Sequence, residues 1–316
     1  MLGADSTAER ESREALGAWV VRRRRVGPVG PIGRMAPAFL LAPAMSLLTL
    51  FVLVPTVLAV ACSFFSVPLT DSGSWRWVGL GNYRTLFADP AVVRALVNTV
   101  LYCGMTIVPS MAIGLGLALA VERAGRGGAL LRTALFLPMT ANLVAMAVVF
   151  RWIFALSGGV ANQLLGYAGI APLNWLGDTR YSLLSVALVG VWRSASFCMI
   201  VFLAGLATVP GVVHESARAD GVRGLAKLRR VTLPMIRPTL VFVTVISVVM
   251  SVQVFDTINV MTAGGPQESS ETVLTMVWQL GFVYFDLGRA AALSSLLLIV
   301  LIAISLLRRR AFAGQA

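Results

Sequence analysis

Charged side chains, histidine, lysine and cysteine are all scarce in this sequence of 316 residues. Only 13% of residues are charged and 58% are hydrophobic, against roughly 25% charged in an ordinary soluble domain. The only histidine is His214, and none of the three cysteines forms a Cys-x-x-Cys pair, which leaves too little for a common zinc site or a Ser-His-Asp triad. The only lysine, Lys227, has no Gly-x-x-x-x-Gly-Lys motif, so an ATPase phosphate loop is absent.

These shortages define what this chain is not expected to do. We expect no catalytic residue, no metal and no bound cofactor, and if the protein uses ATP and Mg²⁺, another chain binds them. The cysteines, Cys62, Cys103 and Cys198, all fall inside apolar runs, and we interpret them as buried free thiols.

Long apolar runs dominate the sequence, and its mean hydropathy is +0.83. Each run is near the ~20 residues that a helix needs to cross a bilayer, and none shows the ~10-residue alternation of a membrane barrel. We therefore predict an all-α polytopic membrane protein with six transmembrane helices. The runs lie at approximately 39–64, 95–121, 130–154, 183–206, 239–256 and 290–307.

The positions of the basic residues predict the orientation of these spans. If the N-terminus is cytoplasmic, the inner segments carry nineteen Lys and Arg residues and the outer segments only five, as the positive-inside rule requires. Both termini are then cytoplasmic. We divide the chain into a basic, partly disordered tail (1–34), a transmembrane domain (35–310) with an inner loop (210–237), and a short tail (311–316). The arginine cluster at 22–25 is interpreted as an orientation signal that contacts membrane lipid, not nucleic acid.

The segment before the second run contains a helix start. Asp89 can accept a hydrogen bond from the first free amides of a helix, and Pro90 fits the first turn because no amide hydrogen is needed there. We predict that the second helix begins at Pro90, outside the membrane. The nearby Trp75, Trp77 and Tyr83 are interpreted as aromatic residues at the headgroup level, with ligand stacking as the alternative.

The 210–237 segment is more than a connector. Ala217, Gly221, Leu225 and Leu228 are spaced four, four and three residues apart, a spacing that places them on one helical stripe. A basic helix of this kind can lie in the lipid headgroups, but two of the four stripe residues are small and allow close approach of another surface. We therefore favour a docking surface, and we expect two short helical pieces that meet near Gly221 because glycine disfavours helix interiors.

Within this segment the sequence resembles the inner-membrane permease subunits of binding-protein-dependent ABC importers, in their maltose-type carbohydrate branch. The family signature is Glu-Ala-Ala, three residues, Gly, nine residues and Ile-x-Leu-Pro. It stands here as 215–217, Gly221 and 231–234, with Ser216 and Val231 as conservative departures. Weaker similarities occur in the expected order, including Asn82-Tyr83, Asn98-Thr99, Leu135 to Pro138, Leu203 to Leu206, and Phe255 to Pro266.

The resemblance implies a non-catalytic subunit of the bacterial cytoplasmic membrane that works by alternating access. Its expected partners are a second related permease, a cytoplasmic ATPase dimer and an extracytoplasmic substrate-binding protein. The loop around Gly221 would be the coupling helix that docks on the ATPase. The residues assigned to this role, from the signature of the family and from the stripe described above, are Glu215, Ser216, Ala217, Asp220, Gly221, Leu225, Leu228, Leu233 and Pro234.

Two other functions were weighed against this one. A secondary transporter usually carries acidic residues at mid-membrane for ion coupling, whereas of 14 acidic residues only Asp256 lies at an apolar run, near its outer end. A membrane-embedded enzyme would need a His, Cys or carboxylate cluster, which the sequence lacks. The ion-driven transporter is kept as the alternative.

The substrate pathway is expected where polar residues interrupt the apolar runs. The candidates are Trp192, Arg193, Gln253, Asp256 and Asn259. The last three recur every third residue and so share a loose helical face. The competing interpretation is hydrogen bonding between helices, or an Arg193–Asp256 ion pair that holds the bundle together. A sugar is favoured as substrate, while a glycerol phosphate ester or another sugar-like solute is left open.

Overall fold

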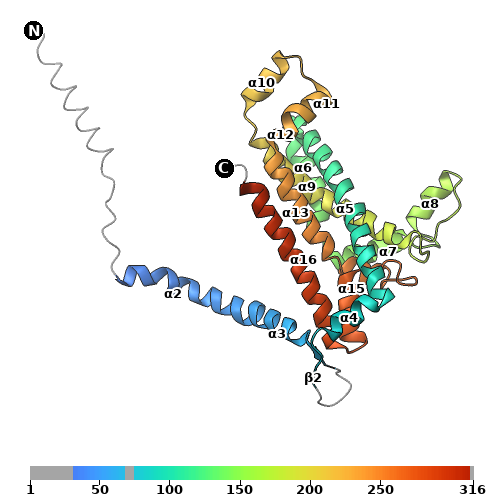
Figure 1. Ribbon diagram of the computed structural model, residues 1–316. Helices are drawn as coiled ribbons and strands as arrows, with labels where there is room; N and C mark the ends of the chain where they lie inside the picture. Colours follow the sequence, from blue (N-terminus) through green and yellow to red (C-terminus); the bar gives the residue numbers. More distant parts are fainter. Residues whose placement is uncertain (1–30, 68–74, 314–316) are drawn as a thin grey trace, which may run out of the picture. The chain divides into compact units, whose positions relative to one another are not determined.

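The computed structural model describes residues 31–67 and 75–313, and the side chains of 40–67, 75–125 and 127–306. Within these ranges the chain is mostly helical (Figure 1). The one departure from an all-α fold is a short antiparallel ribbon in which Phe65 pairs with Trp77. Most of the predicted tail 1–34 and the end of the tail 311–316 lie outside the described residues.

The elements follow in chain order. Those of the first half are α2 (Pro31–Leu48), η1 (Thr49–Leu53), α3 (Val54–Cys62), β1 (Phe65–Ser66), β2 (Arg76–Trp77), α4 (Gly81–Ala88), α5 (Pro90–Arg123), η2 (Gly125–Gly127), α6 (Gly128–Thr140) and α7 (Leu143–Ile153). Those of the second half are α8 (Val160–Tyr167), α9 (Ser182–Ala207), α10 (Gly211–Ala219), α11 (Gly224–Lys227), η3 (Leu228–Thr232), α12 (Leu233–Met235), α13 (Arg237–Val252), α14 (Asp256–Met261), α15 (Val273–Trp278), η4 (Gln279–Val283) and α16 (Leu287–Ala313).

Four helical stretches are long and apolar enough to cross a membrane on their own. They are Leu40–Cys62, Pro90–Arg123, Ser182–Ala207 and Leu287–Leu306. Two further stretches pass the same test only as bent pairs, α6 with α7 at 94° and Gly224–Met235 with α13 at 78°. The described chain therefore holds four to six candidate spans. The predicted run at 130–154 is a broken helix. The run at 239–256 lies in one continuous helix as far as Val252, and the bend of its pair comes before it, at residue 236.

The breaks have local causes. Asn142 separates α6 from α7, because its side chain accepts hydrogen bonds from the amides of Val144 (3.0 Å) and Ala145 (3.2 Å) and so starts a new helix. Pro238 stands in the first turn of α13, where a missing amide hydrogen is tolerated. Both bends are therefore built into the sequence.

Residues 1–57 and 58–316 form two units. The span Leu40–Cys62 crosses the boundary between these units. Two of its hydroxyl groups bond back to their own helix, Ser46 to the carbonyl of Pro43 and Thr56 to that of Val52. An apolar helix whose polar groups bond within the helix is suited to a lipid environment.

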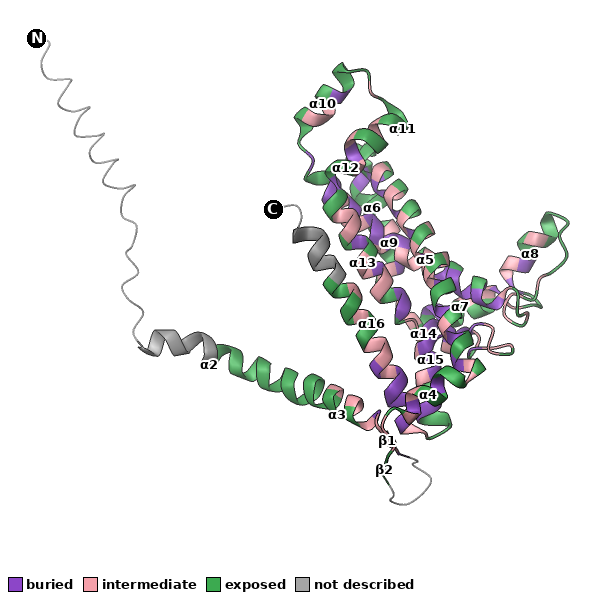
Figure 2. Cartoon of the chain, in the orientation of Figure 1, coloured by how far each residue is buried: buried purple, intermediate pink, exposed green. Residues whose placement is uncertain are grey.

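The core of the second unit is built on α5 and α9 (Figure 2). Gly114 of α5 lies against Ala195 and Cys198 of α9, and any added side-chain carbon at this glycine would collide with both. Small residues let two apolar helices approach closely where lipid offers no hydrophobic drive. Cys198 is buried, but Cys62 and Cys103 are only partly so, and all three are free thiols.

The predicted start of the second helix is confirmed. α5 begins at Pro90, and the Asp89 carboxylate accepts a hydrogen bond from the Ala91 amide at 3.0 Å. The aromatic residues before it pack on one another: Trp77 stacks on Phe64 with ring centroids 5.8 Å apart and meets Phe65 edge-on at 5.1 Å.

Candidate functional site

The 210–237 loop folds as two short helical pieces, as predicted. α10 ends at Ala219 and α11 begins at Gly224. Between them Gly221 has a φ of +73°, a conformation that glycine adopts at little cost. The Gly221 amide donates to the Arg218 carbonyl (3.1 Å) and the Val222 amide to the Ala217 carbonyl (2.9 Å), the paired bonds of a Schellman ending. The elbow is therefore held by its own backbone.

One expectation for this loop is wrong. Ala217, Gly221, Leu225 and Leu228 do not share a stripe of one helix, because the chain leaves the helix at Gly221. Ala217 is buried, Leu225 is 69% exposed, and no atom lies within 4 Å of a side-chain carbon placed on Gly221. The small residue at the elbow is thus open to its surroundings and does not pack inside the chain.

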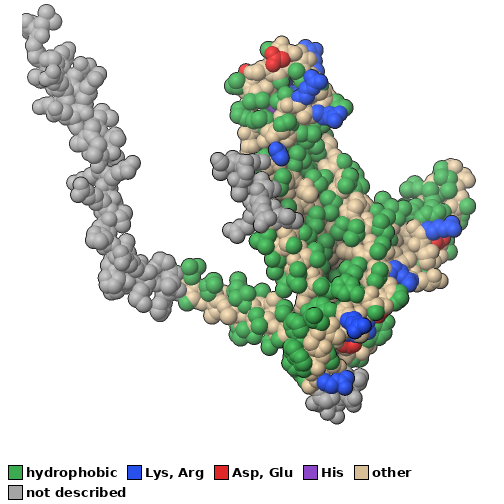
Figure 3. Space-filling model, in the orientation of Figure 1, with side chains coloured by type: hydrophobic (Ala, Val, Ile, Leu, Met, Phe, Trp, Pro, Cys, Tyr) green, Lys and Arg blue, Asp and Glu red, His purple; other side chains and the backbone are tan. Residues whose placement is uncertain are grey.

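The other residues assigned to coupling form an exposed rim on both sides of the elbow. Glu215, Ser216 and Asp220 are exposed on or beside α10. Leu233 is half-buried and the neighbouring Pro234 is exposed, both on α12. Lysine and arginine side chains gather over the same end of the unit (Figure 3).

A small polar cavity lies between α5, α7, α9 and the break that follows α13. Its volume is about 90 Å³, and its lining includes Arg193, Gln253 and Asp256. Trp192 is 44% exposed and meets Phe150 edge-on, whereas Asn259 is not part of this lining. Three of the five predicted pathway residues are therefore brought together.

The predicted helical face of Gln253, Asp256 and Asn259 is not continuous. α13 ends at Val252 and α14 begins only at Asp256. Among the described residues there is also no Arg193–Asp256 ion pair, and the buried Nε of Arg193 has no hydrogen-bond partner. Arg193, Gln253 and Asp256 therefore line the cavity, and Arg193 and Asp256 form no ion pair that would hold two helices together. Another intramembrane arginine, Arg151, donates to the carbonyl of Val260 at 3.3 Å.

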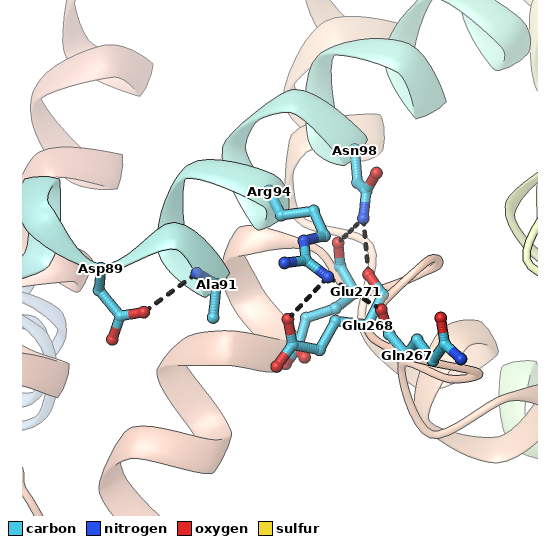
Figure 4. Close-up of polar contacts among 7 residues, drawn as sticks. All are labelled: Asp89, Ala91, Arg94, Asn98, Gln267, Glu268 and Glu271. Atoms are coloured by element: carbon cyan, nitrogen blue, oxygen red, sulfur yellow. Dashed lines mark hydrogen bonds and ion pairs between the residues drawn. The ribbon is translucent and has the colours of Figure 1, made fainter.

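A second polar region, which the sequence reasoning missed, joins the start of α5 to the loop between α14 and α15 (Figure 4). Asn98 donates to the carbonyls of Glu268 and Glu271, both at 2.9 Å. Arg94 reaches the Glu268 carboxylate at 3.4 Å and the Gln267 carbonyl at 3.2 Å. We call the contacts of Arg94, Asn98 and Thr99 with residues 267–273 the outer clamp.

Several motifs of the family resemblance meet at this end of the chain. Thr99 accepts a hydrogen bond from the Val273 amide at 3.0 Å, which adds to the clamp made by Asn98. Asn82 donates to the carbonyls of Ser63 (2.8 Å) and Phe65 (2.9 Å). The Gly264 backbone packs on the Glu271 side chain, 3.4 Å away from a side-chain carbon placed on the glycine. The signal in the sequence was the pair of polar residues 98 and 99 in the first turns of an apolar helix.

Glu271 is buried in this region and is 2% exposed. Its Oε1 has no hydrogen-bond partner among the described residues. Burial raises the pKa of this carboxyl to about 7, and the neighbouring charge of Glu268 acts in the same direction. The group therefore takes up its proton near neutral pH.

A second ion pair ties α5 to the start of α16. Asp89 and Arg289 approach to 2.6 Å, with side chains 33% and 26% exposed. Partial burial raises the pKa of Asp89, but the hydrogen bonds from Arg289 and the Ala91 amide outweigh this, and the net pKa lies below the usual 3.8. One carboxylate thus caps α5 and holds α16.

With this geometry established, comparison with known proteins identifies the family. Residues 112–313 match the inner membrane component of binding-protein-dependent transport systems. The chain belongs to this family. The match includes α9, the 210–237 loop and all later helices.

Two relatives and one solved structure illustrate the relationship. The sulfoquinovosyl glycerol transport system permease protein SmoG of Agrobacterium fabrum is 31% identical over 83% of this chain and 85% of its own length. The lactose transport system permease protein LacF of Rhizobium radiobacter is 30% identical over 83% and 89%. A bacterial ABC transporter involved in the import of alginate has the same fold, with a TM-score of 0.76 at 23% identity over 88% and 97% of the two chains.

Proposed function

We propose that this chain is the permease subunit of an ATP-driven importer that moves a sugar or sugar-like solute across the bacterial cytoplasmic membrane. The observation that carries the proposal is the exposed elbow at Gly221, which lies within the family match. ATP hydrolysis belongs to a partner chain, and the permease itself acts as a mechanical part. Inward-facing and outward-facing arrangements then alternate as the ATPase pair closes and opens.

The 210–237 loop is proposed to transmit that movement. The Schellman ending at Gly221 fixes the angle between α10 and α11, so a force on the elbow is carried to the helices and is not absorbed by a flexible connector. Glu215, Ser216 and Asp220 are exposed and are free to contact the ATPase. Ala217, Leu228 and Leu233 are buried or half-buried and are proposed to keep the loop in shape by packing. The exposed Leu225 and Pro234 are proposed to contact the ATPase.

The topology is proposed to have six spans with both termini cytoplasmic, each bent pair counting as one span. Single-cysteine labelling of intact cells, with Cys62, Cys103 and Cys198 replaced, tests it. A cysteine at Gly127 should resist an impermeant reagent, while one at Gly158, in the loop before α8, should react. The opposite pattern would overturn the orientation.

A second, related permease and an extracytoplasmic binding protein are the further proposed partners. The family match supports both, since it describes a component of binding-protein-dependent transport systems. The outer clamp supports the latter, because it fixes the loop between α14 and α15 at the proposed outer end.

The polar cavity near Arg193 and Asp256 is proposed to lie on the substrate pathway. At about 90 Å³ it is smaller than the roughly 300 Å³ of a typical small ligand pocket, so the path must widen during the cycle. Sugars are bound through hydroxyl hydrogen bonds, and Arg193, Gln253 and Asp256 supply donors and acceptors there. The names of SmoG and LacF support a saccharide as substrate.

Uptake into proteoliposomes separates this function from that of an ion-driven transporter. The complex with its ATPase and binding protein should take up substrate only with ATP and should continue when ion gradients are collapsed. Asp256→Asn and Arg193→Ala should lower uptake at normal assembly, with Arg180→Ala, outside the cavity, as the matched control. If the double Arg193→Ala, Asp256→Ala variant restores assembly that the single variants lose, the pair is structural and the pathway assignment fails.

A further inference from the structure

Three cations that take part in neither ion pair of the described residues face one cavity beside the 210–237 loop. This cavity has a volume of about 590 Å³ and lies between the ends of α5 and α9 and the pieces α10 and α11. Arg123, His214, Arg218 and Lys227 line it, with Glu122 as the single acidic residue and four leucines as the apolar part. Two candidate spans end here, so the cavity is at headgroup depth in the proposed topology.

These charges are not neutralised within the chain. Neither ion pair of the described residues involves Arg123, Arg218 or Lys227. The Nδ1 of His214 is buried and has no hydrogen-bond partner. Without counting the histidine, the cavity has an excess of two positive charges.

A neighbouring hollow has a similar volume, about 610 Å³, and shares Glu122 and Leu206 with the first. Among the residues whose side chains the structure describes, Arg132 is the one cation that lines it, so the described cations do not converge on it as they do on the first cavity. The positive-inside rule explains why arginines lie on this side, but not why three cations and a histidine converge on one cavity with a single carboxylate.

We propose that the cavity between the end of α5 and the loop pieces α10 and α11 binds the headgroup of an anionic phospholipid of the inner leaflet. Guanidinium groups match phosphate oxygens in a two-pronged geometry, and lysine adds a point charge. Basic pockets between helices on the cytoplasmic side are suited to such headgroups. The leucines offer a surface for the start of the acyl chains, which a free phosphate ion would not use.

A lipid held here would connect the fixed end of α5 to the moving loop. Arg123 belongs to α5, whereas Arg218 and Lys227 belong to α10 and α11. A phosphodiester contacted from both sides would bridge the two. The lipid composition of the membrane would then change how tightly the movements of α10 and α11 are coupled to α5.

Native mass spectrometry of the whole complex with its ATPase, purified from nanodiscs that contain phosphatidylcholine with cardiolipin, tests the proposal. The unaltered complex should retain cardiolipin. Arg123→Gln with Lys227→Gln should weaken retention by about fivefold per charge, or ~25-fold together. Arg229→Gln with Arg230→Gln removes the same charge from the same loop, at a separate hollow, and should leave retention unchanged.

Four results would overturn the proposal. The first is that the unaltered complex retains no cardiolipin. The second is that both double variants lose it equally, which would indicate a general basic surface. In the third, excess inorganic phosphate displaces the lipid from the unaltered complex, which would indicate a free-anion site that makes no use of the acyl chains. In the fourth, Arg123→Gln with Lys227→Gln releases the ATPase at unchanged lipid retention, which would assign the cavity to an acidic side chain of the partner.

Discussion

The two ends of α5 are stabilised in different ways. At its start, Asp89, Arg94, Asn98 and Thr99 all bond residues that follow α14 in the sequence, and both ion pairs of the described residues lie there. At its end, Arg123 faces a cavity with other cations and takes part in neither ion pair. The start of α5 is completed by its own chain. At the end, the described residues provide no ion-pair partner for these charges, and the elbow is exposed.

This difference predicts how substitutions at the two ends will behave. Substitutions at the start of α5 should lower the free energy of unfolding, because they remove hydrogen bonds and ion pairs that the chain already makes. Substitutions near the 210–237 loop should weaken coupling to the ATPase or retention of a ligand, while the free energy of unfolding stays nearly normal. A clear exception at either end would break the comparison.

The largest effect is expected at the elbow. Gly221→Phe should lower substrate-stimulated ATP hydrolysis of the reconstituted complex at least tenfold, with weakened co-purification of the ATPase. The φ of +73° strains a non-glycine residue by ~1–2 kcal/mol, and the ring would project into space that this chain leaves open.

Two matched variants separate strain from collision. Gly221→Asn tolerates the left-handed conformation and should keep most of the activity, while Gly221→Ala adds strain with little bulk and should fall between the two. Glu215→Lys reverses a charge on the same exposed rim and should also loosen the ATPase. Normal co-purification and normal stimulation in the Phe variant would remove the docking role from this loop.

The next largest effect is expected in the outer clamp. Asn98→Ala removes the side-chain donor from the buried bond to the Glu271 carbonyl and leaves the Glu268 carbonyl with the Glu271 amide at 3.2 Å, which should destabilise the purified protein by about 1–3 kcal/mol. Thermal unfolding followed by size-exclusion chromatography measures it. Asn142→Ala, which removes a helix cap in an exposed position, should cost only about 1 kcal/mol. Equal losses of stability in the Asn98→Ala and Asn142→Ala proteins would show that the hydrogen bonds of the outer clamp stabilise the fold no more than an exposed helix cap does.

The sequence predicted those features that depend on neighbouring residues. The start of α5 follows from Asp89 and Pro90, and the elbow follows from a glycine in a short amphipathic segment. The apolar runs located the helices because hydrophobic length is a local property.

What the sequence could not predict depends on contacts between distant residues. The spacing of three residues predicted that Gln253 and Asp256 share a helix. The chain is not helical between Val252 and Asp256, and the Val254 carbonyl there accepts a hydrogen bond from the distant Thr272 hydroxyl at 3.3 Å. Likewise, the bonds between Asn98 and Glu271 join residues 173 positions apart. The periodicity of neighbouring residues carries no information about contacts between residues so far apart in the sequence.

A third prediction concerns pH at the outer clamp. The pKa of Glu271 is raised to about 7 from its usual 4.5, so the folded protein binds a proton that the unfolded chain has lost. The free energy of unfolding should therefore be highest below about pH 4.5 and should fall as pH rises through 7. We expect the melting temperature to drop by a few degrees between pH 5 and 8, at roughly 2–4 °C per kcal/mol.

Glu271→Gln removes this titration and should flatten the pH profile, whereas Glu268→Gln should leave most of it in place because burial is the larger cause. A Glu271→Gln protein with the same pH dependence as the original would show that another group is responsible.

The smallest effect is expected at the Asp89–Arg289 pair, where two roles of one carboxylate can be separated. Asp89→Asn keeps an oxygen that can cap α5 but removes the charge, so only the ion pair is weakened. Because both side chains are about one-third exposed or less, and water still screens them, this should cost under ~1 kcal/mol. Asp89→Ala removes the cap as well and should cost about 1 kcal/mol more.

The pH dependence of this pair has the opposite sign to that of Glu271. The pKa of Asp89 is lowered, so its contribution is present above the usual carboxyl pKa and is lost as pH falls below it. Thermal unfolding of Asp89→Asn, Asp89→Ala and the unaltered protein at pH 7 and at a pH well below 3.8 measures the contributions of the cap and of the ion pair. If the Asn and Ala variants melt together, the cap contributes nothing and α5 is held at its start by the outer clamp alone. If Asp89→Asn loses as much as an Asn98→Ala variant, the ion pair is stronger than its exposure allows, and the start of α5 depends on charge more than on hydrogen bonds to the loop.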